Sequence, residues 1–261
     1  MQASHETGSR RLRLLPPLSS KKQSVPFAIP KAPVAKTQAK AKQQAAPKQQ
    51  TASKQKPAAK PKQPAISSPS GYENGHGYVD LGLSVKWATM NVGASSATDY
   101  GDYYAWGETR TKGDYSWSTY FDTNDGGNTF FKYATNKKTT LDLSDDAAHA
   151  NWGGSWRMPT RAEQDELSEK CTWTWSTQNG VKGYKVSSKH NGNSIFLPAA
   201  GFRNDSSRSY GNYWSSSLFT SYSNYGYGLY LSSHDVGFSS HRVGWFYFSR
   251  YDGLSVRAVC P

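Results

Sequence analysis

The residues best suited to chemistry form an acidic, asparagine-rich run in the middle of the chain, Asp122-Thr123-Asn124-Asp125-Gly126-Gly127-Asn128. Its carboxylate and amide oxygens are ligands that Ca²⁺ prefers. An EF-hand loop needs a bidentate Glu at its twelfth position, and here that position is Tyr133. We therefore expect an Asx-rich turn and no cofactor. Calcium bound by this run remains the alternative.

The two cysteines and the histidines do not form a known catalytic or zinc motif. Neither Cys171 nor Cys260 has an adjacent histidine or basic cluster that would activate a thiolate. Two buried thiols, or one structural disulfide in an oxidising compartment, are the alternatives for this pair. The histidines lack the HxH or HExxH spacing of a zinc site, so we expect no metal and no catalytic residues. Those of residues 71–261 are His76, His149, His190, His234 and His241, and the sixth is His5.

The last quarter of the chain is crowded with aromatic and small polar residues. Tyrosine gives a large contact area at low entropic cost, and Ser, Gly and Asn adapt to a partner. The aromatic residues are too many for all to be buried in short strands, so the pattern predicts an exposed binding surface. A β-rich core with alternate tyrosines facing out is the competing interpretation. The expected contact residues are Phe219, Ser221, Tyr222, Asn224, Tyr225, Tyr227, Tyr230, Ser232, His234, Asp235, Phe238, Ser240, His241, Trp245, Tyr247, Ser249 and Tyr251.

The positive charge of the chain is confined to its first part. Residues 1–70 carry 11 Lys, 3 Arg and ten of the 13 Pro against one acid, whereas residues 71–261 carry 17 basic and 18 acidic residues. The first part cannot bury enough apolar surface to offset its ordering entropy, so we expect a disordered arm or linker. Contact of this arm with an anionic surface or partner is the alternative. Nucleic acid is disfavoured, because no aromatic residues interleave the Lys-rich stretch to stack on bases.

The sequence also bounds the broad class of the protein. Two cysteines exclude a disulfide-dense scaffold and a Cys-rich zinc or iron–sulfur site. No apolar run approaches the roughly 18 residues of a membrane-spanning helix. Leu14 and Leu15 are followed at once by two prolines, so no signal peptide is readable.

Residues 71–261 suffice for one domain, and local patterns predict its elements. Thr160 and Glu163 form a capping box for a helix that ends near Lys170. Ser144 can cap a shorter helix before Gly153. Alternation and turn residues predict the strands, and the absence of a βαβ rhythm favours an α+β fold. Strands are expected at 78–83, 84–92, 103–106, 183–188, 194–197 and 254–259, with a long loop at 109–140 and short aromatic strands after residue 211. Asn191–Gly192 predicts a hairpin turn between 183–188 and 194–197.

Several stretches of the folded part then point to a family: YVDLGLSVKWATMNVGAS (78–95), DYYAWGET (102–109), NWGGSWRMPTRAE (151–163), CTWTWSTQNGVKGYKV (171–186), NSIFLPAAGFR (193–203), GNYWSSS (211–217) and GLSVRAVC (253–260). They resemble a large bacterial family of paralogous domains related to the formylglycine-generating-enzyme branch of the C-type lectin fold. The resemblance spans essentially all of 71–261. It implies that the first and last strands of the domain pair. It also implies that the long loops and C-terminal strands carry the binding face.

Two activities of related proteins are not carried over. Formylglycine-generating relatives bind copper through paired cysteines, but Cys171 and Cys260 lie in stretches shared with non-enzymatic paralogues. Sugar-binding C-type lectins use EPN or QPD with WND for calcium, and the corresponding stretches here read FLPAAG and YWSSS. The resemblance therefore implies a non-catalytic binding protein. A lectin or adhesin of fixed specificity and a formylglycine-generating-type enzyme remain the alternatives.

The same branch supplies the variable target proteins of diversity-generating retroelements, in which copying errors at template adenines rewrite codons. Changing the adenines of AAC or AAT cannot give Lys, Glu, Gln, Met or Trp. Segment 217–251 has no Lys, Glu, Gln or Met in 35 residues, and Trp245 is the exception. A general scarcity of these residues on aromatic β surfaces would explain the pattern equally well.

The resemblance thus implies a variable region at about 211–260. Its flanks, 211–216 and 253–260, would be fixed. A Gly- and Ser-rich backbone would not depend on the side chains between them. The expected ligand is a protein or glycan on a host or neighbouring cell surface, and surface or virion display is the favoured location.

Overall fold

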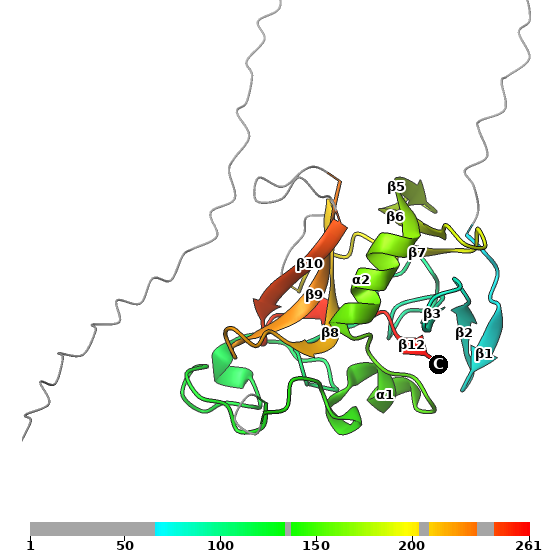
Figure 1. Ribbon diagram of the computed structural model, residues 1–261. Helices are drawn as coiled ribbons and strands as arrows, with labels where there is room; N and C mark the ends of the chain where they lie inside the picture. Colours follow the sequence, from blue (N-terminus) through cyan, green and yellow to red (C-terminus); the bar gives the residue numbers. More distant parts are fainter. Residues whose placement is uncertain (1–65, 134–136, 204–208, 234–242) are drawn as a thin grey trace, which may run out of the picture. The chain divides into compact units, whose positions relative to one another are not determined.

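The computed structural model describes residues 66–133, 137–203, 209–233 and 243–261. The predicted arm, 1–70, lies almost wholly outside this part of the chain. The described residues form mostly β-sheet with two short α-helices, which confirms an α+β architecture (Figure 1). The helices are α1 (Ala147–Trp152) and α2 (Arg161–Lys170), with 3₁₀ turns η1 (Trp117–Thr119) and η2 (Leu143–Asp145). No described helix is long and apolar enough to cross a membrane.

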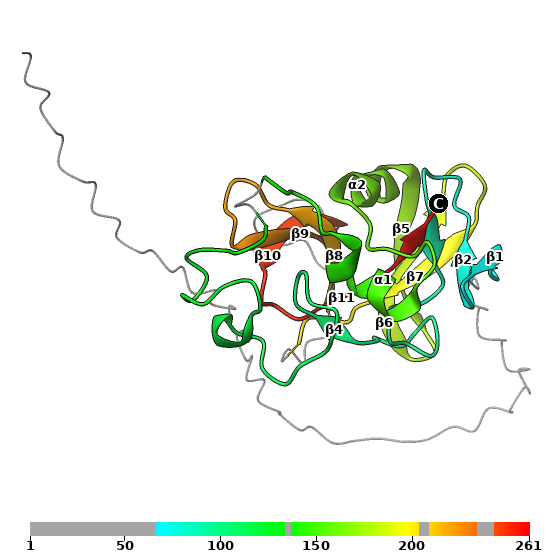
Figure 2. The ribbon, with the colours of Figure 1, turned by 90° about the horizontal axis from the view of Figure 1, so that it is seen from below.

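Three sheets make up the β structure (Figures 1 and 2). The first has the order β1 (Gly71–Glu73), β2 (His76–Val79), β3 (Lys86–Ala88), β12 (Val259–Cys260). The second has the order β10 (Val243–Ser249), β9 (Tyr225–Ser232), β8 (Tyr210–Leu218), β11 (Leu254–Ser255), β4 (Tyr103–Tyr104). The third has the order β5 (Cys171–Gln178), β6 (Val181–Ser188), β7 (Ser194–Pro198).

The expected pairing between the beginning and the end of the folded part is confirmed. Strands β3 and β12 pair antiparallel, with Trp87 opposite Val259. The ladder extends beyond the strands, because the Val92 amide donates to the Val256 carbonyl at 3.0 Å. This pairing brings the first and last parts of the folded region, 71–88 and 259–260, into one sheet. The predicted strand at 78–83 ends at Val79, because the Asp80 carboxylate accepts the Gly82 N–H and turns the chain.

Buried Arg257, 1% exposed, fastens this closure to the rest of the core. Its guanidinium donates to the Asn91 side-chain oxygen at 2.9 Å, the Ala88 carbonyl at 3.1 Å and the Phe196 carbonyl at 2.9 Å. Ala88 and Asn91 belong to one segment, and Phe196 lies more than 100 residues after them. These three hydrogen bonds replace bonds that the guanidinium would make to water. The protein therefore tolerates the burial of this charged group.

The two helices begin where side chains cap them. The predicted capping box of α2 is confirmed: Thr160 Oγ1 accepts the Glu163 N–H at 3.2 Å, and the Glu163 carboxylate accepts the Thr160 N–H at 2.7 Å. The predicted cap of α1 was wrong by two residues. Asp146 is its N-cap, accepting the Ala148 N–H at 2.9 Å, while Ser144 lies in η2. A carboxylate accepts these amides more strongly than a hydroxyl.

The third sheet is a meander whose second turn was predicted. Residues 191–192 connect β6 to β7 as expected, with Gly192 at φ 77°. Strand β5 was not predicted. It joins β6 through Asn179 and Gly180, at φ 48° and 82°, which is the same Asn-Gly hairpin signal.

Tryptophans dominate the core. Trp87, Trp106, Trp156 and Trp214 are each at most 1% exposed. Cys171 and Cys260 are buried free thiols in two different core clusters, so the disulfide alternative is wrong.

Candidate functional site

Seven aromatic side chains gather on β9, β10 and the loop between β8 and β9, and we call this set the aromatic face. Four of them are strongly exposed: Tyr222 at 65%, Trp245 at 47%, Phe246 at 44% and Tyr247 at 37%. The other three, Phe219, Tyr225 and Tyr227, are half-buried. Exposed aromatic clusters of this kind are the usual signature of a binding surface.

The rings of the aromatic face hold one another in place. Tyr247 lies between Phe219 and Phe246, with ring centroids 4.6 and 4.9 Å away and planes nearly parallel. Tyr222 stacks on Phe219 at 6.1 Å, and Tyr227 meets Phe219 edge-on at 5.1 Å. Stacked and edge-to-face pairs each contribute about 0.5–1.5 kcal/mol beyond their burial. The outer surface of the face is therefore ordered before any partner arrives.

Helix α2 supplies the one charged side chain seen against these rings in the described part of the chain. The guanidinium of Arg161 lies 4.4 Å from the centroid of Trp245 and 4.7 Å from that of Tyr227. Asp165, one turn along the helix, pairs with it at 3.3 Å. Sequence analysis missed Arg161, because its aromatic neighbours follow it by more than 60 residues. The stacking of Arg161 on Trp245 is a structural reason for Trp245 to stay fixed within the expected variable region.

Glycines on β9 are required by the packing beneath the face. A Cβ at Gly226 would lie 2.7 Å from the Trp106 ring, and one at Gly228 would lie 2.8 Å from the Tyr213 carbonyl. Leu229 and Leu231 of the same strand are buried at 2% and 0% exposure. The expectation that the backbone of 217–251 is independent of its side chains is thus wrong for these positions. Burial, and not strand alternation, divides the segment into outward residues such as Tyr222 and inward residues such as Leu231.

A buried ion pair anchors the loop that carries Tyr222. Arg250 and Asp122, at 0% and 1% side-chain exposure, are paired directly. Arg250 also donates to the Tyr120 hydroxyl at 2.9 Å, to the Ser223 carbonyl at 3.2 Å and, from its backbone, to the Asn224 carbonyl at 3.0 Å. This one side chain ties the long loop after β4 to the β8–β9 loop.

The carboxylates of the acidic run considered for calcium accept hydrogen bonds from within the chain. Asp122 is the partner of Arg250 and also accepts the Lys132 N–H at 2.7 Å. Asp125 accepts the N–H groups of Asn128 and Thr129, both at 2.9 Å, which is the expected Asx-rich turn. The bonds from Thr129 hold the pKa of Asp125 well below its usual range. Among the described residues, no three His, Cys, Asp or Glu side chains are grouped as metal ligands.

The remaining contact residues predicted from the sequence are dispersed. Ser221 is exposed, and Asn224, Tyr230, Ser249 and Tyr251 are half-buried. Tyr230 lies on the opposite side of the sheet from Tyr227, stacked on Tyr210 at 6.2 Å. Ser232 is buried at 5% exposure and presents no side chain at the surface. The other five lie outside the described residues: His234, Asp235, Phe238, Ser240 and His241.

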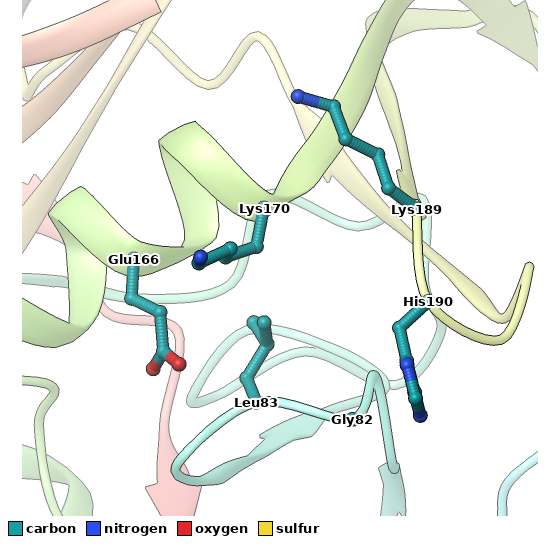
Figure 3. A pocket seen from close by; sticks show the side chains of 6 residues that line it. All are labelled: Gly82, Leu83, Glu166, Lys170, Lys189 and His190. Atoms are coloured by element: carbon teal, nitrogen blue, oxygen red, sulfur yellow. The ribbon is translucent and has the colours of Figure 1, made fainter.

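A hollow of about 350 Å³ lies at the other end of α2, lined by Gly82, Leu83, Glu166, Lys170, Lys189 and His190 (Figure 3). Its polar groups serve local structure. Glu166 accepts the N–H and hydroxyl of Ser84, and Lys189 donates to the Glu169 carbonyl at the end of the helix. Figure 3 shows Lys189 pointing away from the hollow. We therefore place the candidate site at the aromatic face.

Comparison with known proteins gives no relative. No family model, curated protein or solved structure matches this chain. The argument for function therefore depends on the geometry of the aromatic face and on the residues that support it.

Proposed function

We propose that this chain is a non-catalytic binding protein that contacts a protein or glycan on another cell through its aromatic face. The observation that carries the proposal is the set of four ordered rings that each remain 37–65% exposed. Large rigid rings give contact area with little loss of side-chain entropy. No ionisable acid or base belongs to this set apart from tyrosine hydroxyls, so the face suits a neutral partner surface.

We further propose that the domain has the C-type lectin fold of the formylglycine-generating branch. The pairing of β3 with β12 supports this assignment, as does the position of the aromatic face on the C-terminal strands. Binding is favoured over the enzymatic alternative by the two thiols. Burial raises the pKa of Cys171 to about 11, so this thiol stays protonated at neutral pH. It also lies in a different core cluster from Cys260.

Diversification of the face is part of the proposal, and the division of 217–251 into outward and inward positions makes it testable. The test is to sequence the genomic DNA on both sides of this gene. We expect a reverse transcriptase gene and a near-copy of the region encoding 211–260. Mismatches should fall at template adenines and in codons for outward residues such as Tyr222 and Tyr247. Codons for Gly226, Leu231 and Arg250 should match. The absence of a repeat, or mismatches spread over the inward codons, would rule out diversification.

Ligand binding is tested with the double variant Tyr222→Ser/Tyr247→Ser. Tyr72→Ser is a matched control, because Tyr72 is 71% exposed on β1. The probes are a printed glycan array and a panel of whole bacterial cells, used untreated, treated with protease or oxidised with periodate. We expect binding that the double variant loses at least tenfold and that the control retains.

Sensitivity to protease would identify a protein ligand, and sensitivity to periodate together with array binding would identify a glycan ligand. Equal binding by the double variant and the wild-type chain would contradict the proposal.

A further inference from the structure

Strand β10 is the outermost strand of its sheet, with β9 on one side and no described strand on the other. Its seven residues pair with β9 in an unbroken antiparallel register, from Val243 opposite Leu231 to Ser249 opposite Tyr225. In an antiparallel ladder, alternate residues direct their N–H and C=O groups away from the neighbour. The outer side of β10 therefore offers unpaired backbone donors and acceptors to a further strand.

Soluble proteins usually block such an edge with a charge, a proline or a bulge. The sequence of β10, VGWFYFS, has no charge and no proline, and its pairing with β9 has no bulge. Strand β5, at the edge of the third sheet, provides a contrast. It is also uncharged, but its exposed side chains are the threonines Thr172, Thr174 and Thr177. Strand β1, at the edge of the first sheet, exposes Tyr72 but also carries the charged Glu73. Among the described strands, β10 is the uncharged edge strand with several exposed aromatic side chains.

Exposure on β10 is symmetric about its centre. The middle residues Trp245, Phe246 and Tyr247 are exposed, and the two residues on each side are less so. We propose that β10 pairs antiparallel with β10 of a second copy of this chain, about a two-fold axis at Phe246. Phe246 then faces its own copy, and Trp245 of each copy faces Tyr247 of the other. Two-fold dimers are the commonest assembly, and aromatic cross-strand pairs are favourable.

Charge supports a second copy over a charged partner. A neutral strand paired with itself brings no like charges together, and no acidic or basic side chain on β10 would select another sequence.

The interface between the two copies is small. Three rings exposed by 37–47% contribute on the order of 250 Å² of apolar area per copy, taking about 200 Å² for a whole ring. The total lies below the roughly 1,200 Å² of a stable complex, so the dimer is weak and depends on concentration.

Gly244 provides the variant that tests this dimer. A Cβ at Gly244 meets nothing within 4 Å, so Gly244→Lys places a charge at the edge without a clash. Gly113 has the same free space on a loop, and Gly113→Lys is the matched control. The measurement is sedimentation equilibrium of the full chain from about 5 µM to 1 mM. We expect the wild-type chain and the control to dimerise with a Kd above roughly 10 µM, and Gly244→Lys to weaken dimerisation at least tenfold.

A second pair of variants tests the register. Phe246→Lys and Phe246→Glu should each be monomeric alone and should associate when mixed, because residue 246 faces its own copy. A wild-type chain that stays monomeric at 1 mM would overturn the proposal. So would a dimer that Gly244→Lys leaves unchanged. Ligand binding is read separately through the single variant Tyr222→Ser, because Tyr222 lies on the β8–β9 loop and not on β10. Failure of one proposal therefore does not imply failure of the other.

Discussion

Two buried arginines hold the two functional parts of the molecule, and they do so by different means. Arg257 joins the terminal strands to the core through neutral oxygens, whereas Arg250 joins the loops of the aromatic face through a carboxylate. Burial lowers the pKa of Arg257 to about 10. Arg250 is instead enclosed by aromatic rings, with its guanidinium 4.2 Å from the centroid of Phe130 and 4.8 Å from that of Trp106.

The different contacts of the two arginines distinguish a frame, which closes the domain, from the aromatic face. The frame is made of β3, β12 and the segments around Arg257. It is held by two backbone carbonyls, which every sequence possesses, and by the side-chain oxygen of Asn91. The loops of the face depend on one specific acid, Asp122, that must be retained together with Arg250. We therefore expect the two arginines to respond differently to substitution.

The largest effect is expected from Arg250→Met, which leaves the Asp122 carboxylate buried without its cation. Breaking a buried pair from one side costs about 3–5 kcal/mol. Adding Asp122→Leu should recover more than half of this loss, since no charge is then left unpaired. Urea unfolding of the single and double variants measures both effects. A double variant no more stable than Arg250→Met would show that Arg250 acts through contacts other than the ion pair.

Arg257→Met should cost about 2–4 kcal/mol, because three buried acceptors lose their donor. No second substitution in a side chain can restore the bonds to the Ala88 and Phe196 carbonyls. Arg257→Lys should recover little, since an ammonium lacks the planar fork that reaches all three oxygens. Full recovery by Lys, measured by urea unfolding, would contradict this account of the frame.

Glycine substitutions should separate inward from outward positions within the face. Gly226→Ala should cost about 1–3 kcal/mol, because its Cβ would meet the Trp106 ring. Gly244→Ala, with open space around it, should change the free energy of unfolding by less than about 0.5 kcal/mol. Thermal unfolding of both variants checks the contrast, and equal costs would remove the evidence for two classes of position.

A further effect concerns pH. Burial raises the pKa of Asp252, which follows β10, to about 7. The folded chain then holds a proton that the unfolded chain releases near pH 4, so stability falls as the pH rises from 4 to 7. Asp252→Asn should remove this slope and raise stability at pH 8 by on the order of 2 kcal/mol. The exposed Asp114→Asn should keep the slope. If stability still falls with pH in Asp252→Asn, another titratable group causes the slope.

Local signals in the sequence predicted the parts of the fold that depend on neighbours along the chain. The Thr160–Glu163 box and the turn at 191–192 are complete within a few residues, and both are confirmed. The sequence has the same Asn-Gly signal at 179–180, where the structure has a hairpin that we did not predict. The cap of α1 was misplaced because Ser144, Asp145 and Asp146 are all capable of capping, and only tertiary contacts select the last.

The site was predicted in composition but not in organisation. The sequence showed that tyrosines crowd 217–251. Alternation does not separate inward from outward positions, because half-buried Tyr227 and buried Leu229 lie on the same face of β9. The Arg250–Asp122 pair spans 128 residues, and no local pattern links its members. Arg161 was missed for the same reason. Long-range charge and cation–π contacts are properties of the folded chain.

The central claim is that the outward rings contact a partner while the frame folds without them. Its most direct test is the free energy of unfolding of the triple variant Tyr222→Thr/Phe246→Thr/Tyr247→Thr, compared with the single variant Leu231→Ala. Leu231 is fully buried, so its truncation should cost about 2–5 kcal/mol. We expect the triple variant to unfold cooperatively and to lose less than that. A triple variant that loses more than Leu231→Ala, or that no longer unfolds cooperatively, would contradict the account.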